Sequence, residues 1–298
     1  MTEKTINKII FPAPNFDWEN LDKYKQYLIH IPTKRKIKDK ESKETEKIPC
    51  LFKKCAESPN ILIIFHCNGG DIFGLFRVFH DLLGKEINIL VPEYPGYSIY
   101  KSPLSSEKCL ENSLIVYDFI LNNIKNITEK NIYILGRSLG TGPAVYLSSK
   151  RNPAGTFLIS PYTTFAAVAE DHHKEEESKA LSNHFRSIDY IDKINNPILI
   201  IHGKKDRLIK YMEAIKLYEK CKKDIIRDIY LIDNMTHNFS YNLLEDKIIP
   251  YIKNFVSKNC PLKNNVDDKN KNIIDFNQEY YTLPEDLINI WNMKKIKK

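Results

Sequence analysis

The sequence predicts an α/β fold with a mostly parallel, doubly wound sheet and helices on both faces. Short apolar runs of strand length, such as residues 61–65 and 197–201, alternate with stretches of helix length. Runs that are apolar throughout are typical of strands buried on both faces of a parallel sheet. A glycine-flanked segment, residues 136–140, stands between a strand-like and a helix-like run. With 298 residues and 42% hydrophobic content, the chain is long enough for one such domain with appendages.

The expected elements follow one another along the chain. Residues 24–31 and 47–52 are expected to be opening strands, separated by a charged turn at residues 34–46. The next four expected elements are a strand at 61–65, a helix at about 73–83, a strand at 87–91 and a helix at about 106–124. Ser105 or Ser106 can cap the long helix. Beyond it we expect strands at 131–135, 155–159, 197–202 and 226–232, and helices from 141 and at about 211–221 and 243–256. Repeated βα units imply a sheet whose chemistry lies at the carboxyl ends of its strands.

Three parts are expected along the chain. They are an N-terminal arm at residues 1–23, an α/β domain at 24–257 with a cap segment at about 161–194, and a Lys/Asn-rich tail at 258–298. The cap holds an acidic and histidine-containing cluster at 171–177, which favours a solvated charged helix over a metal site. The tail has an amphipathic stretch at 283–291, and the sequence leaves open whether the tail docks on the domain or is disordered.

Composition and charge exclude several classes of protein. No apolar run approaches the roughly 18 residues that span a bilayer, and the first residues lack a secretory signal. The six cysteines have no CxxC pairing, which favours reduced thiols over a disulfide framework or a zinc site. The net charge of +7 comes from lysines interleaved with acidic residues, so no nucleic-acid partner is expected. We therefore expect a cytoplasmic monomer without metal or cofactor, and weak attraction of its lysines to anionic membranes stays open.

Gly136-Arg137-Ser138-Leu139-Gly140 has the G-x-S-x-G pattern between an apolar run and a helical one. This pattern is typical of a nucleophile elbow, because small residues on either side of the serine permit the tight turn that exposes its hydroxyl. The motif therefore predicts a serine hydrolase with Ser138 as the nucleophile. No G-x-G-x-x-G or P-loop lysine motif supports a dehydrogenase or a nucleotide-binding protein.

A nucleophilic serine needs a base and an acid that orients the base. Among eight histidines, His237 lies in a polar loop between the last expected strand and the last long helix. Asp206 lies just beyond the strand at 197–202, whereas Asp224, Asp228 and Asp233 follow a strand end less directly. The order Ser138, Asp206, His237 is that of α/β hydrolases.

Acyl transfer also requires donors for the developing oxyanion. The backbone N–H of Leu139, directly after the nucleophile, is the first candidate. The glycine-rich loop after the strand at 61–65 is expected to supply the second, from the N–H of Asn68.

These residues carry a resemblance to a known family. The matching segments are His66-x-Asn68-Gly69-x-Asp71, residues 93–97, 136–143, 160–164 and 200–206, and His237-Asn238. In this order and spacing, from about residue 10 to 256, the chain resembles the α/β-hydrolase-domain-containing 17 group of the Bem46-like branch. The resemblance implies an α/β-hydrolase fold with Ser138, Asp206 and His237 as the triad. It also implies a thioesterase that removes palmitate from cysteines of membrane-associated proteins.

The chain departs from this family at three places. After Tyr97, residues 98–101 lack the second glycine that is common there, so we expect a more crowded and aromatic rim of the site. Cys67 stands where the family usually has glycine, and we expect it to be a packed side chain rather than a second nucleophile. Animal members resemble proteins anchored through an N-terminal cysteine cluster, whereas the first cysteine here is Cys50. Membrane contact would then depend on surface lysines and on the apolar segment at residues 9–11.

Three functions stay open at this point. The favoured one is an acyl-protein thioesterase that acts on an acylated protein, and the runner-up is a lysophospholipase or small-ester carboxylesterase with a lipid-like ester substrate. A non-catalytic hydrolase-fold interaction protein is the third. Four apolar residues near the expected site are candidates to accept an acyl chain, although core packing explains them equally well: Ile72, Phe73, Phe165 and Phe239.

Overall fold

A computed structural model describes residues 5–6, 10–36, 45–56, 58–170, 179–259 and 274–296. Within these residues, eight strands form one sheet in the order β1-β2-β4-β3-β5-β6-β7-β8. The strands β1 and β2 are antiparallel to their neighbours, and the other six run parallel. The strand bounds are β1 Leu28–Lys36, β2 Thr45–Lys53, β3 Ile61–Phe65, β4 Asn88–Pro92, β5 Ile132–Arg137, β6 Gly155–Ile159, β7 Ile198–Gly203 and β8 Arg227–Ile232.

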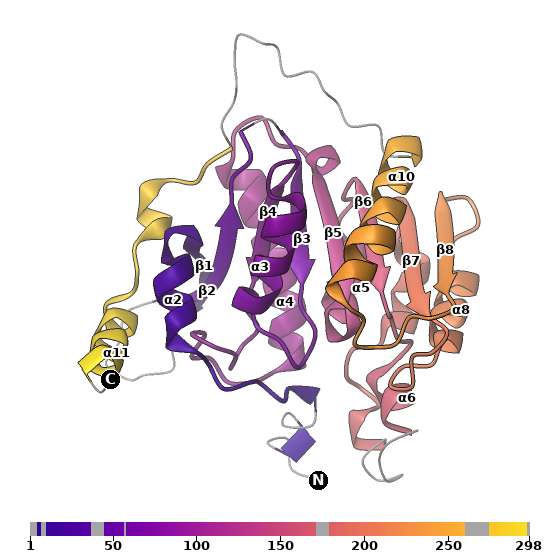
Figure 1. Ribbon diagram of the computed structural model, residues 1–298, viewed down its shortest axis with the longest axis horizontal. Helices are drawn as coiled ribbons and strands as arrows, with labels where there is room; N and C mark the ends of the chain where they lie inside the picture. The colour runs from indigo at the N-terminus through magenta and orange to yellow at the C-terminus, as the bar shows by residue number, and fades with distance from the viewer. Residues whose placement is uncertain are drawn as a thin grey trace.

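Helices cover both faces of this sheet (Figure 1). One face carries α2 (Trp18–Tyr24), α3 (Ile72–Leu83) and α10 (Ile249–Asn259). The other carries α4 (Ser106–Asn123), α5 (Thr141–Lys150) and α8 (Tyr211–Lys220). The structure therefore has the mostly parallel, doubly wound architecture that the sequence predicts.

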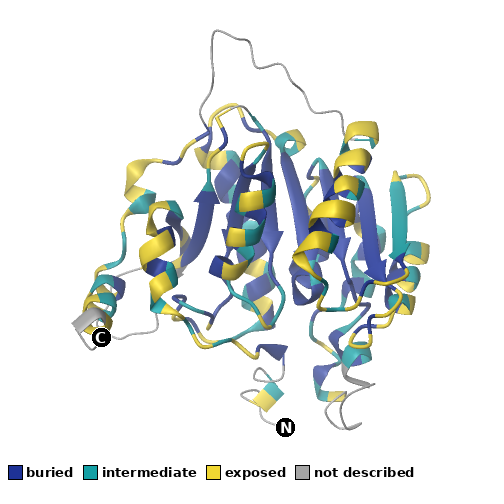
Figure 2. Cartoon of the chain, in the orientation of Figure 1, coloured by how far each residue is buried: buried dark blue, intermediate teal, exposed yellow. Residues whose placement is uncertain are grey.

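The central strands are buried on both sides, as their uninterrupted apolar sequences predict (Figure 2). Because successive side chains of a strand point to opposite faces, alternate residues of β3 enter different cores. Ile61, Ile63 and Phe65 pack with the α4 and α5 side, whereas Leu62 and Ile64 pack with the α3 and α10 side. Side chains of β3 thus pack into the cores on both faces of the sheet.

The helix starts follow from local capping. The Asp71 carboxylate accepts from the N–H of Gly74 at the start of α3, and the Ser105 hydroxyl accepts from the N–H of Lys108 at the start of α4. Ser105, one of the two residues expected to cap the long helix, is thus its N-cap. The single helix expected at 243–256 instead runs from α9 (Tyr241–Leu243) through a π-helical stretch, Leu244–Ile248, into α10.

The first strand begins later than expected. Tyr24 ends α2, residues 25–27 form a 3-10 turn, and β1 starts at Leu28, so the prediction of a strand at 24–31 is wrong in its first half. Asp17 caps α2 through the N–H of Glu19. The buried ring of Tyr24 then packs on α3, with its centroid 5.9 Å from that of Phe76. Helix packing outweighs the strand preference of these aromatic residues.

The N-terminal arm contributes to the core. Ile10 is fully buried and Phe11 is 2% exposed, with the Phe11 ring in edge contact with Tyr97 and Phe185. The expectation that the apolar segment at 9–11 reaches a membrane is therefore wrong for Ile10 and Phe11, while Ile9 lies outside the described residues. Within the part of the chain that the structure describes, no helix combines the length and apolar character needed to cross a bilayer.

The cap segment and the tail flank the sheet. The segment expected to be a cap contains the helix α6 (Phe165–Glu170) and two short 3-10 helices, Ser187–Asp189 and Ile191–Lys193. The cluster at 171–177 lies outside the described residues. The tail docks on the domain over residues 274–296 and ends in α11 (Glu285–Ile296), which lies beside α2 (Figure 1). Lys25 of the turn after α2 lies over the Trp291 ring, 4.5 Å from its centroid.

Candidate active site

Ser138 lies at a sharp turn between β5 and α5. Its φ is +52°, a region that is uncommon for a residue with a side chain and that marks functional turns. The flanking glycines permit this turn. A Cβ added at Gly136 would lie 2.4 Å from the carbonyl oxygen of Gly140, and a Cβ added at Gly140 would lie 2.2 Å from the carbonyl oxygen of Phe65. The structure thus shows the strand-turn-helix geometry that G-x-S-x-G predicts.

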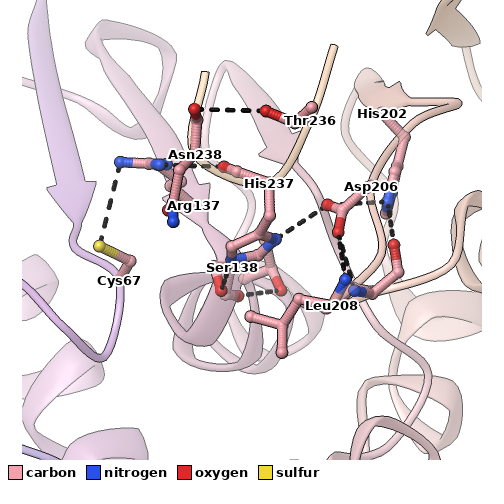
Figure 3. Close-up of polar contacts among 11 residues, drawn as sticks. Cys67, Arg137, Ser138, His202, Asp206, Leu208, Thr236, His237 and Asn238 are labelled. Carbon is pink, nitrogen blue, oxygen red and sulfur yellow. Dashed lines mark hydrogen bonds and ion pairs between the residues drawn. The ribbon is translucent and has the colours of Figure 1, made fainter. Parts of the chain in front are cut away.

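Three sequence-predicted residues meet at the carboxyl ends of the strands (Figure 3). Ser138 Oγ lies 3.0 Å from His237 Nε2, and His237 Nδ1 lies 2.8 Å from Asp206 Oδ2. These residues follow β5, β8 and β7, respectively. Since a carboxylate only accepts, Nδ1 carries the proton, and the Nε2 lone pair is free to accept the Ser138 hydroxyl proton.

Asp206 is held in the ionised form. Burial of its carboxyl group raises the pKa, but hydrogen bonds from the histidines and from backbone N–H groups outweigh burial and leave the pKa well below its usual range. The N–H groups of Leu208 and Ile209 both donate to Oδ1 at 2.9 Å. His202 Nε2 is 3.5 Å from Asp206 Oδ2 but 2.8 Å from the Ile209 carbonyl oxygen, so the closer His237 is the main imidazole partner.

The rival aspartates do not take this position. Asp233 is exposed and forms an ion pair with Lys204 at 2.8 Å, and Asp228 accepts from the N–H of Ile229. Of the carboxylates in the described part of the chain, Asp206 is the one in contact with His237. The structure therefore brings together the acid, base and nucleophile that chain order selects.

The two predicted oxyanion donors lie on the turn after Ser138 and on the loop after β3. Leu139 is in the first turn of the helical segment that leads into α5, where an N–H has no carbonyl four residues earlier in the helix. Asn68 lies in the turn after β3, where its carbonyl oxygen accepts from Tyr97 Oη at 2.9 Å. No described residue accepts a hydrogen bond from the Asn68 N–H. Both amides are thus unused within the described structure, and their role as donors stays a prediction.

Arg137 is a site residue that sequence reasoning missed. Its Nη2 donates to the His237 carbonyl oxygen at 3.2 Å, and its guanidinium carbon lies 4.5 Å from the centroid of the Phe239 ring. Its Nη1 is 3.9 Å from the sulfur of Cys67, which is half-buried as a packed side chain. Arg137 thus ties the histidine loop to the loop after β3. Arg137 occupies a free position of the motif, so the pattern itself carries no signal for this role.

A cavity of about 170 Å³ adjoins this site and is lined in part by Arg137 and Phe239. Of the four apolar residues expected to accept an acyl chain, Phe239 alone lines this cavity. Ile72 and Phe73 are buried between α3 and the sheet, and Phe165 packs edge-on against Tyr162. Core packing therefore explains those three.

Comparison with known proteins identifies relatives of this chain. This chain is 31% identical over 182 residues to human alpha/beta hydrolase domain-containing protein 17B. The match covers 60% of this chain and 62% of the relative. It is 30% identical over 215 residues to protein 17C of Xenopus tropicalis, covering 71% of this chain and 66% of the relative. The chain thus matches less than two thirds of the length of these relatives. No protein-family model matches it.

Solved structures share the fold. The Pyrococcus furiosus esterase superposes with a TM-score of 0.61 at 17% identity, over 83% of this chain and 97% of that one. Est1E from Butyrivibrio proteoclasticus superposes with a TM-score of 0.58 at 16% identity, over 77% and 99%. At this level of identity, the likeness shows that the chain has the α/β-hydrolase fold.

Proposed function

Because the chain belongs to the α/β hydrolase domain-containing protein 17 group, we propose that it is a serine hydrolase that cleaves ester or thioester bonds. The observation that carries this proposal is the hydrogen-bonded series from Ser138 Oγ through the His237 imidazole to the Asp206 carboxylate. A base with a correctly placed lone pair next to a serine hydroxyl is what nucleophilic acyl transfer requires.

The reaction would proceed in two steps. Ser138 Oγ attacks the substrate carbonyl carbon as His237 Nε2 takes its proton, and the oxyanion accepts from the N–H groups of Leu139 and Asn68. Collapse of the tetrahedral intermediate expels the alcohol or thiol, which takes the proton from His237. Water then attacks the acyl-Ser138 ester with His237 again as base, and the acid product leaves. Ionised Asp206 stabilises the imidazolium in both steps.

The favoured subtype is an acyl-protein thioesterase, with palmitoylated cysteine of a membrane-associated protein as substrate. The support for this subtype is the resemblance of motifs in the loop after β3, at the elbow and at His237. The runner-up, a small-ester carboxylesterase or lysophospholipase, is supported by a structural neighbour named as an esterase. Both use the same acyl-Ser138 chemistry and differ in the group attached to the carbonyl.

Labelling with a fluorophosphonate probe tests the enzyme class. We expect the wild-type protein and Asp233→Asn to be labelled, and Ser138→Ala to remain unlabelled although folded. A folded wild-type protein without probe on Ser138 would favour a non-catalytic interaction protein instead. The subtype is tested by comparing turnover of a palmitoylated peptide, a matched oxyester and a lysophospholipid at equal concentration. Preference for the lysophospholipid would contradict the thioesterase proposal.

A further inference from the structure

The cavity beside Arg137 lies between α3 and the segment that follows His237. One wall is a single face of α3, formed by two adjacent pairs one helical turn apart: Gly74 and Leu75, and Val78 and Phe79. Phe239, Leu244 and Ile159 form further parts of the lining. The π-helical stretch that begins at Leu244 thus contributes directly to the cavity.

Three lining residues connect this cavity to the proposed machinery. Arg137 directly precedes Ser138, Cys67 directly precedes Asn68, and Phe239 lies two residues after His237. Ser138 and His237 are absent from the lining within the described residues. The cavity therefore begins next to the place where a substrate carbonyl would sit.

The polar groups of the lining are already engaged. His66 contacts Glu93 at 2.8 Å, Asp71 caps α3, and Arg137 donates to the His237 carbonyl. A ligand in this cavity would find few free hydrogen-bonding groups, so a hydrocarbon chain suits it better than a polar group. Dry apolar cavities of about 150 Å³ bind benzene, so about 170 Å³ corresponds to about six carbons.

We propose that this cavity binds the first carbons of the substrate acyl chain and so sets a chain-length preference. This inference rests on the proposed function of Ser138. The geometry of His237 indicates that the cavity receives the acyl chain and not the leaving group. The backbone carbonyl of His237 accepts from Arg137 at the cavity, whereas its Nε2 faces Ser138. The leaving group takes its proton from Nε2 and therefore lies away from the cavity.

Turnover of p-nitrophenyl esters from acetyl to palmitoyl tests the proposal. Each buried methylene is expected to raise kcat/KM about fourfold, up to about six carbons, beyond which longer chains gain little. Val78→Trp and Leu75→Trp would fill the cavity, and we expect each to lower the ratio of kcat/KM for hexanoyl to kcat/KM for acetyl at least tenfold. The matched control is Arg77→Trp, on the exposed face of the same helix. A wild-type profile without chain-length dependence, or an equal loss for all chains, would overturn the proposal.

Two further experiments distinguish a failure of the cavity inference from a failure of the hydrolase proposal. Acetate esters of lengthening alcohols report on the leaving group, and a loss confined to that series in Val78→Trp would reassign the cavity to the alcohol. Titration of Ser138→Ala with methyl hexanoate, followed by NMR, reports binding without turnover. Binding that Val78→Trp abolishes, in a protein that cleaves no ester, would keep the cavity inference and reject the hydrolase proposal. Binding unaffected by Val78→Trp or Leu75→Trp would reject the cavity inference.

Discussion

His66 Nε2 lies 2.8 Å from Glu93 Oε1, and both side chains are buried. His66 Nδ1 lies 2.8 Å from the carbonyl oxygen of Cys67, which can only accept, so Nδ1 carries a proton. The Cys67 carbonyl and the Asn68 N–H belong to one planar peptide and point in opposite directions. The Cys67 oxygen also accepts from the N–H of Gly70 at 3.2 Å. Together with this bond, His66 and Glu93 therefore set the direction of the proposed oxyanion donor.

Glu93→Gln tests this positioning role. Glu93 also accepts from the N–H of Ile72 and the hydroxyl of Ser98, so the neutral amide would loosen the loop without removing a reacting group. Loss of one oxyanion donor costs roughly 10²–10³ in kcat, and we expect a fall of about tenfold to 10²-fold with little change in KM. Steady-state kinetics on a short-chain ester measure both constants.

Glu213→Gln is the matched control, because Glu213 is also a buried carboxylate that accepts a backbone N–H, from Thr163. It should leave kcat within a few fold. An equal fall in kcat for both variants would mean that Glu93 acts through general stability and not through the donor loop.

Asp206→Asn tests the acid of the proposed triad. Asparagine keeps the shape but can no longer stabilise the imidazolium, and it favours the wrong tautomer of His237, so kcat is expected to fall by roughly 10⁴. Asp233→Asn, an exposed rival in the same region, should retain full turnover. Near-normal turnover of Asp206→Asn would contradict the assignment.

Features carried by local sequence could be predicted. The bounds of β3 and β6 coincide with the expected strands, because an unbroken apolar run between turn residues has few other structures in an α/β fold. Ser138, Asp206 and His237 could be found for a related reason. The motif gives one residue, and chain order at successive strand ends then restricts the other two.

Features that depend on distant packing could not be predicted. Arg137 donates to a carbonyl 100 residues away, and His66 pairs with a carboxylate 27 residues away. Neither pairing leaves a periodic or spacing signal in the sequence. The helical start of the segment at 24–31 was missed because the packing of Tyr24 on α3 decides it.

His30 is expected to make the fold sensitive to acid. It lies on β1, where burial, and then the charge of Lys47, lowers its pKa from 6.5 to about 4. Above pH 6.5 His30 is neutral in the folded and unfolded chains. As the pH falls toward 4, the unfolded chain gains a proton that the folded chain excludes, so the free energy of unfolding falls by about 3 kcal/mol.

Urea unfolding of wild-type protein and His30→Gln between pH 7 and pH 4 measures this effect. The difference in unfolding free energy between the two proteins should change by up to about 3 kcal/mol across this range, in favour of the variant at low pH. A difference independent of pH would show that His30 takes up its proton alike in both states.

Phe276 is expected to hold the tail on the domain. Its ring is 4% exposed and lies 4.8 Å from Phe52 on β2 and 5.4 Å from Phe119 on α4, measured between centroids. Buried Phe→Ala changes cost about 3–5 kcal/mol, but a terminal segment can detach. We therefore expect Phe276→Ala to lower the unfolding free energy by up to about 3 kcal/mol and to expose residues 274–296 to proteases.

Met293→Ala is the control for the tail, because Met293 is 56% exposed on α11 and its truncation removes little packing. Turnover of a short ester should be unchanged in both variants, since the tail lies beside α2 and β2 rather than at Ser138. If Phe276→Ala kept wild-type stability and protease resistance, other contacts would have to hold the tail, namely the buried Ile274 and Leu287 or the salt bridges Lys54–Asp275 and Lys101–Asp286. Exposed ion pairs usually contribute less than about 1 kcal/mol each and weaken in salt, so protease sensitivity at high salt would then distinguish the two modes of docking.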